Sequence, residues 1–385
     1  MRYPLLIIGA SVRAAAMSAS RAGFSPIASD LFADMDLVAL CPTTRVSRYP
    51  YDFESIADAS PPTPFIYTGG LENYPDLIER IAKNRELFGN SGAILRGVRN
   101  PQVVAECLSR QGIPFPELRA EHAVLTGAKW LMKPLQGSGG NRIRFCNEQP
   151  DARLQSSGGW FFQQFISGPS YSAVYVGDGS QATMIGLTQQ LVGADWLGAK
   201  RFAYCGSIGP INVTLKRQLQ LEALGDCLVD SFKLLGFFGV DLIIRDDEIW
   251  PIEVNPRYTA SVEVLELAMS LNAMSLHVAS CRKQSISPTL PRATTTPTFG
   301  KAICYADADI EMTEQTIDFA RRLNNKTNWP VFADLPFPGT FVKKGSPIAT
   351  AIACGSSDEE VLNELKSLWH SFEATVDRQA SILEH

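Results

Sequence analysis

The stretch that decides the fold is Gly239-Val240-Asp241-Leu242-Ile243-Ile244, followed by Trp250-Pro251-Ile252-Glu253-Val254-Asn255-Pro256-Arg257. Two apolar runs flank the acidic turn 245–248, which predicts two adjacent strands joined as a hairpin. Because side chains two residues apart on a strand point to the same face, Glu253 and Asn255 project together. With Asp241 they offer three oxygen ligands of the kind that Mg²⁺ takes up beside nucleotide phosphates. The stretch therefore predicts a metal site, with an ordinary polar-edged hairpin as the alternative.

Arg257 ends this stretch two residues after Asn255. A guanidinium group can meet a carboxylate or a phosphate with two parallel hydrogen bonds. We therefore expect Arg257 to bind an anion beside the predicted metal site.

A glycine-rich loop lies well upstream, directly after an apolar strand that ends at Lys133 and Pro134. The loop 135–142 contains Gly137, Ser138, Gly139 and Gly140. A lysine at this point can reach phosphates as a point charge, while glycines let backbone N–H groups approach them closely. Such a loop can also close over a site as a lid. The sequence predicts a phosphate-binding loop, with a solvated hairpin tip as the alternative.

Length and composition limit the class of protein. The 385 residues suit two to four domains, and a hydrophobic content of 45% with 19% charged residues is typical of a globular chain. A net charge of −5 argues against a nucleic-acid partner, since no basic field is available to neutralise phosphates. No apolar run approaches the roughly 20 residues that span a bilayer. The eight cysteines are scattered without a C-x-x-C pair. We expect a cytoplasmic protein with reduced thiols and no membrane partner.

The order of the expected elements divides the chain into parts. Strands at 5–9 and 26–30 around a helix at 11–22 form a βαβ unit, which favours a parallel sheet. The predicted domains are an N-terminal α/β domain over 1–100, a central domain over 101–285, a linker rich in Pro, Thr and Ser over 286–300, and a small β-rich domain with a terminal helix over 301–385. The central domain has apolar strands near 129–134, 160–166, 171–176 and 183–187, and a helix over 215–235 that Gly236 ends.

These segments together resemble the ATP-grasp superfamily. The resemblance covers roughly residues 100–275 and rests on four features in order: the run from Lys133 to Gly140, the strand 162–166 with Gly168 and Ser172, the run 239–241, and the run 253–257. It implies a mixed α/β fold with a parallel N-terminal α/β domain, a central two-part nucleotide-binding domain and a small β-rich C-terminal domain. It also implies ATP bound between two sheets and an acyl-phosphate mechanism.

The resemblance further implies a role for each matching residue. Lys133 would contact the α- and β-phosphates and Arg257 would stabilise the transferring phosphoryl group, as the two catalytic residues. The cofactors would be ATP and Mg²⁺, with Mn²⁺ as an alternative metal. The residues that bind the nucleotide would be Lys133, Gly137, Ser138, Gly139 and Gly140 at the phosphates, and Gln163, Gln164, Phe165 and Ile166 at the adenine; those that bind the metal would be Asp241, Glu253 and Asn255. Gln164 stands where many relatives carry Glu.

The flanking segments look like a subgroup of carboligase-type ATP-grasp proteins associated with C1-carrier (methanopterin or methanofuran) metabolism. The runs concerned are 9–13, 30–34, 200–206 and 344–348. Arg13, Lys200 and Arg201 are candidates to bind a substrate, with solvated surface charges as the alternative for the last two. The expected function is ATP-dependent coupling of a carboxylate to an amine, including glutamate ligation in C1-carrier biosynthesis. The alternative is a catalytically silent ATP-binding regulatory or scaffold protein. Expected partners are ATP, small-molecule carboxylate and amine substrates, and a second copy of the chain in a homodimer.

Overall fold

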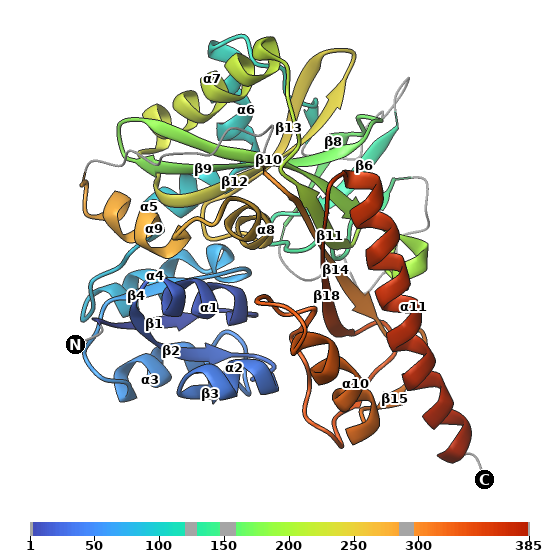
Figure 1. Cartoon of the computed structure of the whole chain (residues 1–385). Coiled ribbons are helices and arrows are strands. Elements are labelled where there is room, and N and C mark those ends of the chain that lie inside the picture. The colour runs from blue at the N-terminus through green and yellow to red at the C-terminus, as the bar shows by residue number, and fades with distance from the viewer. Residues whose placement is uncertain (1–2, 120–128, 147–158, 285–295, 384–385) are drawn as a thin grey trace.

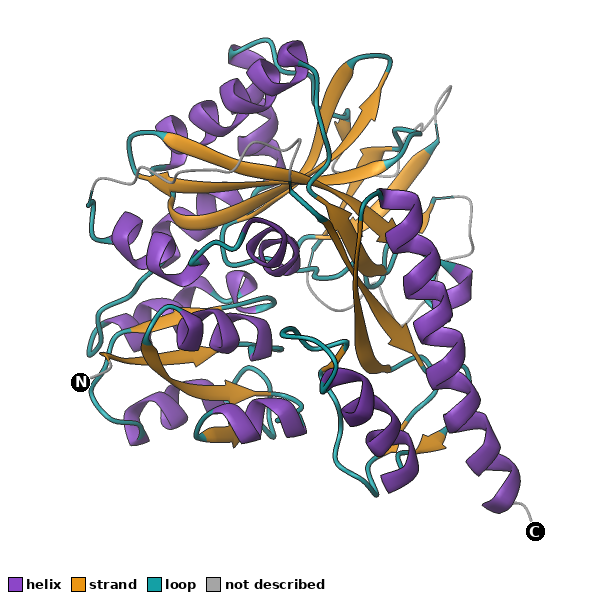
Figure 2. Ribbon diagram, viewed as in Figure 1, coloured by secondary structure: helices purple, strands orange, loops and turns teal. Residues whose placement is uncertain are grey.

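A computed structural model describes residues 3–119, 129–146, 159–284 and 296–383 (Figure 1). The N-terminal part contains a parallel four-stranded sheet in the order β3-β2-β1-β4. Its strands are β1 (Tyr3–Ile8), β2 (Phe24–Asp30), β3 (Thr43–Arg45) and β4 (Phe65–Tyr67). Helices lie on both sides of this sheet (Figure 2), so its central strand is apolar on both faces, with residues 5–8 wholly buried. The predicted parallel α/β arrangement is confirmed.

The helices of the N-terminal part connect these strands and lead into the next part. They are α1 (Arg13–Arg21), α2 (Met35–Leu40), α3 (Asp52–Ala59), the 3-10 turn η1 (Leu71–Asn73), α4 (Pro75–Ala82) and α5 (Gly92–Val98). Helix α6 (Pro101–Arg110) then begins at Asn100, whose side chain accepts hydrogen bonds from the backbone N–H groups of Gln102 and Val103.

The central part contains two antiparallel sheets. The smaller has the order β5-β8-β6-β7, from β5 (Leu118–Arg119), β6 (Trp130–Pro134), β7 (Arg144–Phe145) and β8 (Trp160–Gln164). The larger has eight strands in the order β13-β12-β9-β10-β11-β14-β18-β16. The strands from the central part are β9 (Ser170–Asp178), β10 (Ala182–Val192), β11 (Tyr204–Gly209), β12 (Leu235–Arg245) and β13 (Glu248–Asn255).

The C-terminal segment continues the same large sheet. Strand β14 (Thr298–Tyr305) pairs with β11, β18 (Pro347–Gly355) pairs with β14, and β16 (Phe332–Ala333) forms the edge. A two-stranded ribbon of β15 (Ile310–Glu311) and β17 (Phe341–Val342), helix α10 (Glu314–Asn324) and the long helix α11 (Asp358–Leu383) complete it, and α11 packs along β14 and β18 (Figure 1). The predicted domain limits stay predictions, while the sheet itself runs without interruption from the central part into the C-terminal one.

The remaining helices cover the large sheet. They are α7 (Leu215–Phe232), α8 (Ala260–Met269) and α9 (Ala273–Cys281), with the 3-10 turn η3 (Asp195–Leu197) between β10 and β11. Among the described residues no single helix is long and apolar enough to cross a membrane. Helices α8 and α9 are long and apolar enough only when taken together, and they are bent by 117° where they meet.

The predicted end of the helix over 215–235 was wrong. Helix α7 ends at Phe232 because Lys233 takes the left-handed conformation (φ 57°), and Gly236 lies in β12. Gly236 has φ 74°, and a Cβ there would lie 2.4 Å from the His277 ring, so packing explains this glycine. Strand β14 begins at Thr298, inside the predicted linker 286–300, whose residues 286–295 lie outside the described chain, so the limits of the linker stay a prediction.

Candidate functional site

A cavity of about 680 Å³ lies where the N-terminal part, both central sheets and the C-terminal strands meet. The structure gathers most of the residues predicted from the sequence in its wall: Arg13, Lys133, Ser138, Gly139, Gly140, Gln163, Gln164, Phe165, Ile166, Arg201, Asp241, Glu253, Asn255 and Arg257. Gly137 lines a smaller adjoining cavity of about 50 Å³ that shares Lys133. Lys200 is exposed beside the turn at Gly345 and is absent from the described wall of both cavities.

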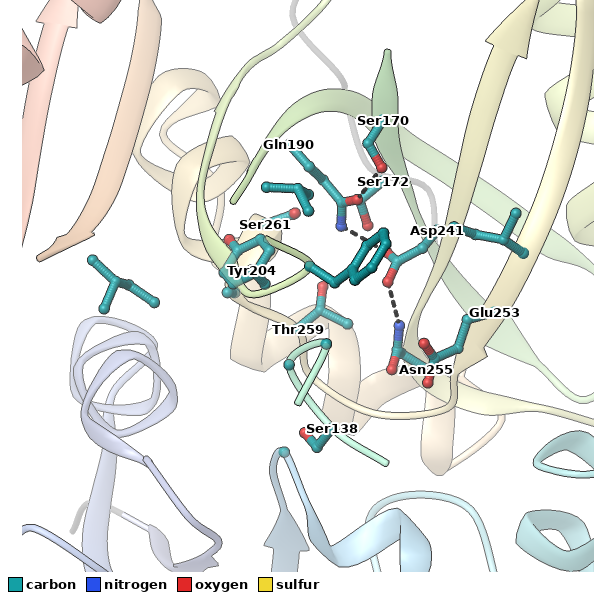
Figure 3. A pocket seen from close by; sticks show the side chains of 18 of the residues that line it. Ser138, Ser170, Ser172, Gln190, Tyr204, Asp241, Glu253, Asn255, Thr259 and Ser261 are labelled. Atoms are coloured by element: carbon teal, nitrogen blue, oxygen red, sulfur yellow. Dashed lines mark hydrogen bonds between the residues drawn. The ribbon is translucent and has the colours of Figure 1, made fainter. Parts of the chain in front are cut away.

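The register of the β12–β13 hairpin brings the three predicted metal ligands together. Asp241 lies opposite Glu253, and Asn255 lies opposite Gly239. The Asn255 amide donates to Asp241 Oδ2 (3.0 Å), and the Gln190 amide donates to Asp241 Oδ1 (2.9 Å), as Figure 3 shows. Among the described residues no three His, Cys, Asp or Glu side chains form a metal-binding group, so a metal here needs the amide oxygen of Asn255 as the third protein ligand.

The electrostatics of this hairpin fit a bound cation. Burial and, after it, the negative charge of Glu253 raise the pKa of Asp241 to about 6. Two carboxylates that face each other in a buried place repel, and a divalent cation between them would favour both charged forms. The donor set of two carboxylates and one amide is therefore suited to Mg²⁺.

Glu253 is already paired with a basic side chain that the sequence reasoning missed. Arg99, directly after α5, donates from Nη1 to Glu253 Oε1 (2.7 Å) and to the Val254 carbonyl (3.1 Å). Burial opposes ionisation of Glu253, but the charges of Arg99 and then Lys133 outweigh it and lower the pKa of Glu253. The sequence held one signal for Arg99: Asn100-Pro101 marks the start of a helix, which puts Arg99 at the junction between two helices.

Lys133 is buried on β6 and faces the same hairpin. Its ammonium donates to Gln163 Oε1 (3.1 Å) and to the Ile252 carbonyl (3.5 Å). Burial lowers the pKa of Lys133, and the charge of Glu253 opposes that shift. The Gln163 side chain thus orients Lys133 between the two sheets, in addition to the adenine role that the resemblance implies.

The glycine loop lies against the segment that leads into β11. The Tyr204 backbone N–H donates to the Gly139 carbonyl (3.1 Å). Gly140 has φ 75°, and a Cβ there would lie 1.7 Å from the Phe202 carbonyl oxygen, so only glycine allows this approach. Gly139 also has a positive φ of 62°, but nothing lies within 4 Å of its would-be Cβ. Residues 138–140 line the cavity, and we call this arrangement of the loop against residues 202–204 the closed loop.

Two aromatic rings, those of Phe165 and Phe202, line one part of the cavity, and both pack on the neighbouring Phe145. The Phe145 ring contacts Phe165 (5.2 Å between centroids) and Phe202 (5.4 Å), and the Arg201 guanidinium lies 4.8 Å from the Phe145 centroid. Flat, apolar walls of this kind suit a purine ring. The Phe165 backbone N–H donates to the Lys129 carbonyl (2.8 Å), so this amide is not available to an adenine.

Arg257 follows β13 directly and lies beside Asn255 of the metal hairpin. Nε donates to Glu72 Oε1 (2.8 Å), Nη2 to Asn255 Oδ1 (3.3 Å) and Nη1 to the Tyr258 carbonyl (3.3 Å). These bonds use three of the five guanidinium N–H groups and leave two for an anion in the cavity.

The N-terminus of α8 adds to this anion site. Thr259 precedes the helix and lines the cavity; it is 7% exposed, and its hydroxyl oxygen has no hydrogen-bond partner among the described residues. The free N–H groups of a first helical turn and the helix dipole both favour negative charge. Arg257 and the start of α8 together form a place for a carboxylate.

Arg13 does not have the free donors that a substrate contact needs, contrary to the sequence prediction. Its guanidinium binds Glu263 with Nη1 and Nη2 and binds Asp334 with Nε (2.9 Å) and Nη2 (3.1 Å); the Met17 sulfur lies 3.6 Å from Nη1. Arg13 is 1% exposed, and it bridges the N-terminal part to α8 and to the C-terminal segment.

Comparisons with known proteins match the central part of the chain to a known domain family. Residues 100–261 match the ATP-grasp domain family. An uncharacterised protein of Methanocaldococcus jannaschii is 24% identical over 277 residues, a match that spans 69% of this chain and 63% of that protein.

Two solved structures extend the likeness to the whole fold. L-amino acid ligase from Bacillus licheniformis has a TM-score of 0.72 at 15% identity and covers 95% of this chain and 97% of that one. The biotin carboxylase domain of 2-oxoglutarate carboxylase from Hydrogenobacter thermophilus, in complex with MgADP, ADP and bicarbonate, has a TM-score of 0.69 at 14% identity and covers 94% and 89%. At these identities the likeness shows the fold.

Proposed function

Since this chain contains an ATP-grasp domain between residues 100 and 261, we propose that it is an ATP-dependent ligase that activates a carboxylate and couples it to an amine. The observation that carries the proposal is the convergence in one cavity of a buried lysine, a closed glycine loop, a hairpin of oxygen ligands and a partly free arginine. Simple nucleotide binding has no need for Arg257 and the start of α8 in the wall of the same cavity.

ATP would lie along the cavity with its purine beside Phe165 and Phe202 and its phosphates between Lys133 and the glycine loop. The backbone N–H groups of residues 138–140 would meet the terminal phosphate, while the buried ammonium of Lys133 compensates charge on the inner phosphates. The metal would be held by Asp241, Glu253 and Asn255, where it would compensate charge on the phosphates.

The carboxylate substrate would bind Arg257 and the N-terminus of α8. Its oxygen attacks the γ-phosphorus, the bond from that phosphorus to ADP breaks, and an acyl phosphate forms. The amine nitrogen then attacks the acyl carbon, loses a proton and expels phosphate, which leaves an amide. Arg257 stabilises negative charge at the transferring group throughout, and the closed loop excludes water that would hydrolyse the acyl phosphate.

The identity of the substrates is proposed from the sequence resemblance alone. They include glutamate as the carboxylate and amines of C1-carrier precursors. The competing function is that of a catalytically silent ATP-binding protein, and the experiment below separates it from the ligase.

The test measures ADP release from ATP and Mg²⁺ across a panel of carboxylates, glutamate included, each with and without hydroxylamine. Hydroxylamine traps acyl phosphates as hydroxamates, so it reports activation without the natural amine. Tyramine-like amines and amino acids are then tested as acceptors with each active carboxylate. Carboxylate-dependent ADP and hydroxamate are expected from the wild type. Tight ATP binding with no stimulation by any carboxylate would favour the silent protein and refute the ligase.

A further inference from the structure

The short turn η1 of the N-terminal part contacts both halves of the candidate active site. Glu72 and Asn73 are consecutive, yet one binds Arg257 and the other binds the glycine loop. Neither residue belongs to the central domain that the family match covers. The turn therefore links the N-terminal part to two groups that the proposed reaction needs in fixed positions.

Glu72 forms a buried ion pair with the guanidinium of Arg257. The Glu72 side chain is fully buried, and Oε1 accepts from Arg257 Nε at 2.8 Å. Gly69 lies under the same group, because a Cβ there would come 3.4 Å from Arg257 Cζ. The neighbouring Pro256 carbonyl accepts from Tyr67 Oη (3.4 Å) and from the Asn90 amide (3.0 Å). The N-terminal part thus fixes Arg257 through both its side chain and its backbone.

Asn73 holds the entry to the glycine loop. Its amide donates to the Gly137 carbonyl (3.1 Å), and its Oδ1 accepts from Arg99 Nη2 (3.1 Å). Arg99 Nη2 also donates to the Gly137 carbonyl (3.0 Å), while its Nη1 binds Glu253 (2.7 Å). The Asn73 carbonyl accepts from the Gln136 amide (3.3 Å). The loop is therefore tied to the N-terminal part and to a candidate metal ligand through one hydrogen-bonded triad of Asn73, Arg99 and Gly137.

We propose that Glu72 and Asn73 are positioning residues that couple closure of the glycine loop to the orientation of Arg257. This inference rests on the proposed ligase function. Each residue acts through another group: Asn73 stabilises the closed loop over the nucleotide, and Glu72 directs the two remaining Arg257 donors toward the carboxylate. Because the two residues are adjacent on one 3-10 turn, a movement of that turn would change both contacts at once.

The two roles predict different kinetic effects. Replacement Asn73→Ala weakens the closed loop, so it should raise the KM for ATP and the Kd of a non-hydrolysable ATP analogue by about 5- to 30-fold, the equivalent of one or two lost hydrogen bonds. Replacement Glu72→Ala frees the guanidinium, so it should lower kcat and raise the KM for the carboxylate while the analogue Kd stays near the wild-type value. Glu72→Gln keeps one carbonyl acceptor for Arg257 Nε and should recover most of the lost turnover.

The controls separate positioning from loss of folding. Glu54→Gln removes an exposed ion pair with Arg80 in the same N-terminal part and should change none of these constants. The melting temperature of every variant is measured in parallel. Protease cleavage within residues 137–140, with and without the ATP analogue, reports loop closure without any carboxylate substrate, and Asn73→Ala should lose the protection that the analogue gives.

The outcomes decide between the two proposals. If no carboxylate stimulates wild-type ADP release, the proposed function fails, while analogue binding and proteolysis still test the role of Asn73. If Asn73→Ala binds and protects like the wild type, the loop coupling is refuted. If Glu72→Ala lowers the melting temperature and all kinetic constants together, and Glu72→Gln does not recover turnover, Glu72 is only structural and its positioning role is refuted.

Discussion

Replacement of the two left-handed glycines in the closed loop gives a matched pair of variants that tests whether the closed loop binds ATP. Both Gly139 (φ 62°) and Gly140 (φ 75°) have a conformation that costs a residue with a side chain about 1–2 kcal/mol. Gly139→Ala adds only this cost, because nothing lies within 4 Å of the new methyl group. Gly140→Ala would also put its methyl carbon 1.7 Å from the Phe202 carbonyl oxygen, which is backbone and cannot turn away.

The expected magnitudes follow from these two terms. Strain alone weakens the closed state by about 5- to 30-fold in Gly139→Ala, since about 1.4 kcal/mol corresponds to a factor of ten. The collision in Gly140→Ala adds about 1–3 kcal/mol, the usual cost of an overpacked site, so binding of the ATP analogue should be weaker by roughly a further 5- to 150-fold.

The assay is isothermal titration of a non-hydrolysable ATP analogue into the wild type and both variants, with the KM for ATP measured beside it. The matched comparison removes any general effect of alanine on loop flexibility. Equal affinities of the two variants would refute the reasoning, because the contact between Gly140 and Phe202 would then be irrelevant to nucleotide binding.

Three further results are expected. Glu253→Gln should cut turnover by about 100-fold or more while the melting temperature hardly changes, since Gln still accepts from Arg99; wild-type turnover at ordinary Mg²⁺ would contradict the metal assignment. Burial lowers the pKa of His277 to about 4, so as the pH falls from 6.5 to 4 the unfolded chain binds a proton that the folded chain does not, and the free energy of unfolding should fall by on the order of 3 kcal/mol. Urea unfolding of the wild type and of His277→Gln measures this loss. Identical dependence of stability on pH in the two proteins would contradict it. Arg13→Ala should lower the free energy of unfolding by about 3 kcal/mol, because Asp334 loses its buried guanidinium partner while Glu263 keeps Lys301. Unchanged stability with a raised substrate KM would instead restore the substrate role predicted for Arg13.

The local geometry of the candidate site was predictable because it depends on short spacings. The alternation of the strand puts Glu253 and Asn255 on one face, and a hairpin between two apolar runs brings Asp241 opposite Glu253. The glycine loop was predictable for the same reason, since the positive φ of Gly139 and Gly140 is a local requirement that glycine meets. What a strand or turn determines within a few residues can be read from the sequence.

The partners of these residues were not predictable, because they come from distant parts of the chain. Arg99 reaches Glu253 across 154 positions, and Glu72 reaches Arg257 across 185. The saturation of Arg13 has the same origin, since Glu263 and Asp334 lie 250 and 321 positions away. Sequence spacing alone holds no information about which carboxylate a basic side chain will find. An arginine that suits an anion site can therefore be fully used by the protein itself.

The pairing of charges across this site explains how a cavity with so many ionised groups can exist before a ligand binds. Glu253 is compensated by Arg99, and Arg257 is compensated by Glu72, so neither this partly buried carboxylate nor this partly buried guanidinium is left alone. Arg99 and Glu72 form these pairs across the seam, which is the contact between the N-terminal and central parts. Removal of one partner of a buried pair costs far more stability than the intact pair contributes. The seam therefore has to stay docked for the site to keep its charges compensated. Because ATP and a metal would bring further opposite charges to the same groups, binding should strengthen this docking, and the N-terminal part becomes a component of the active site.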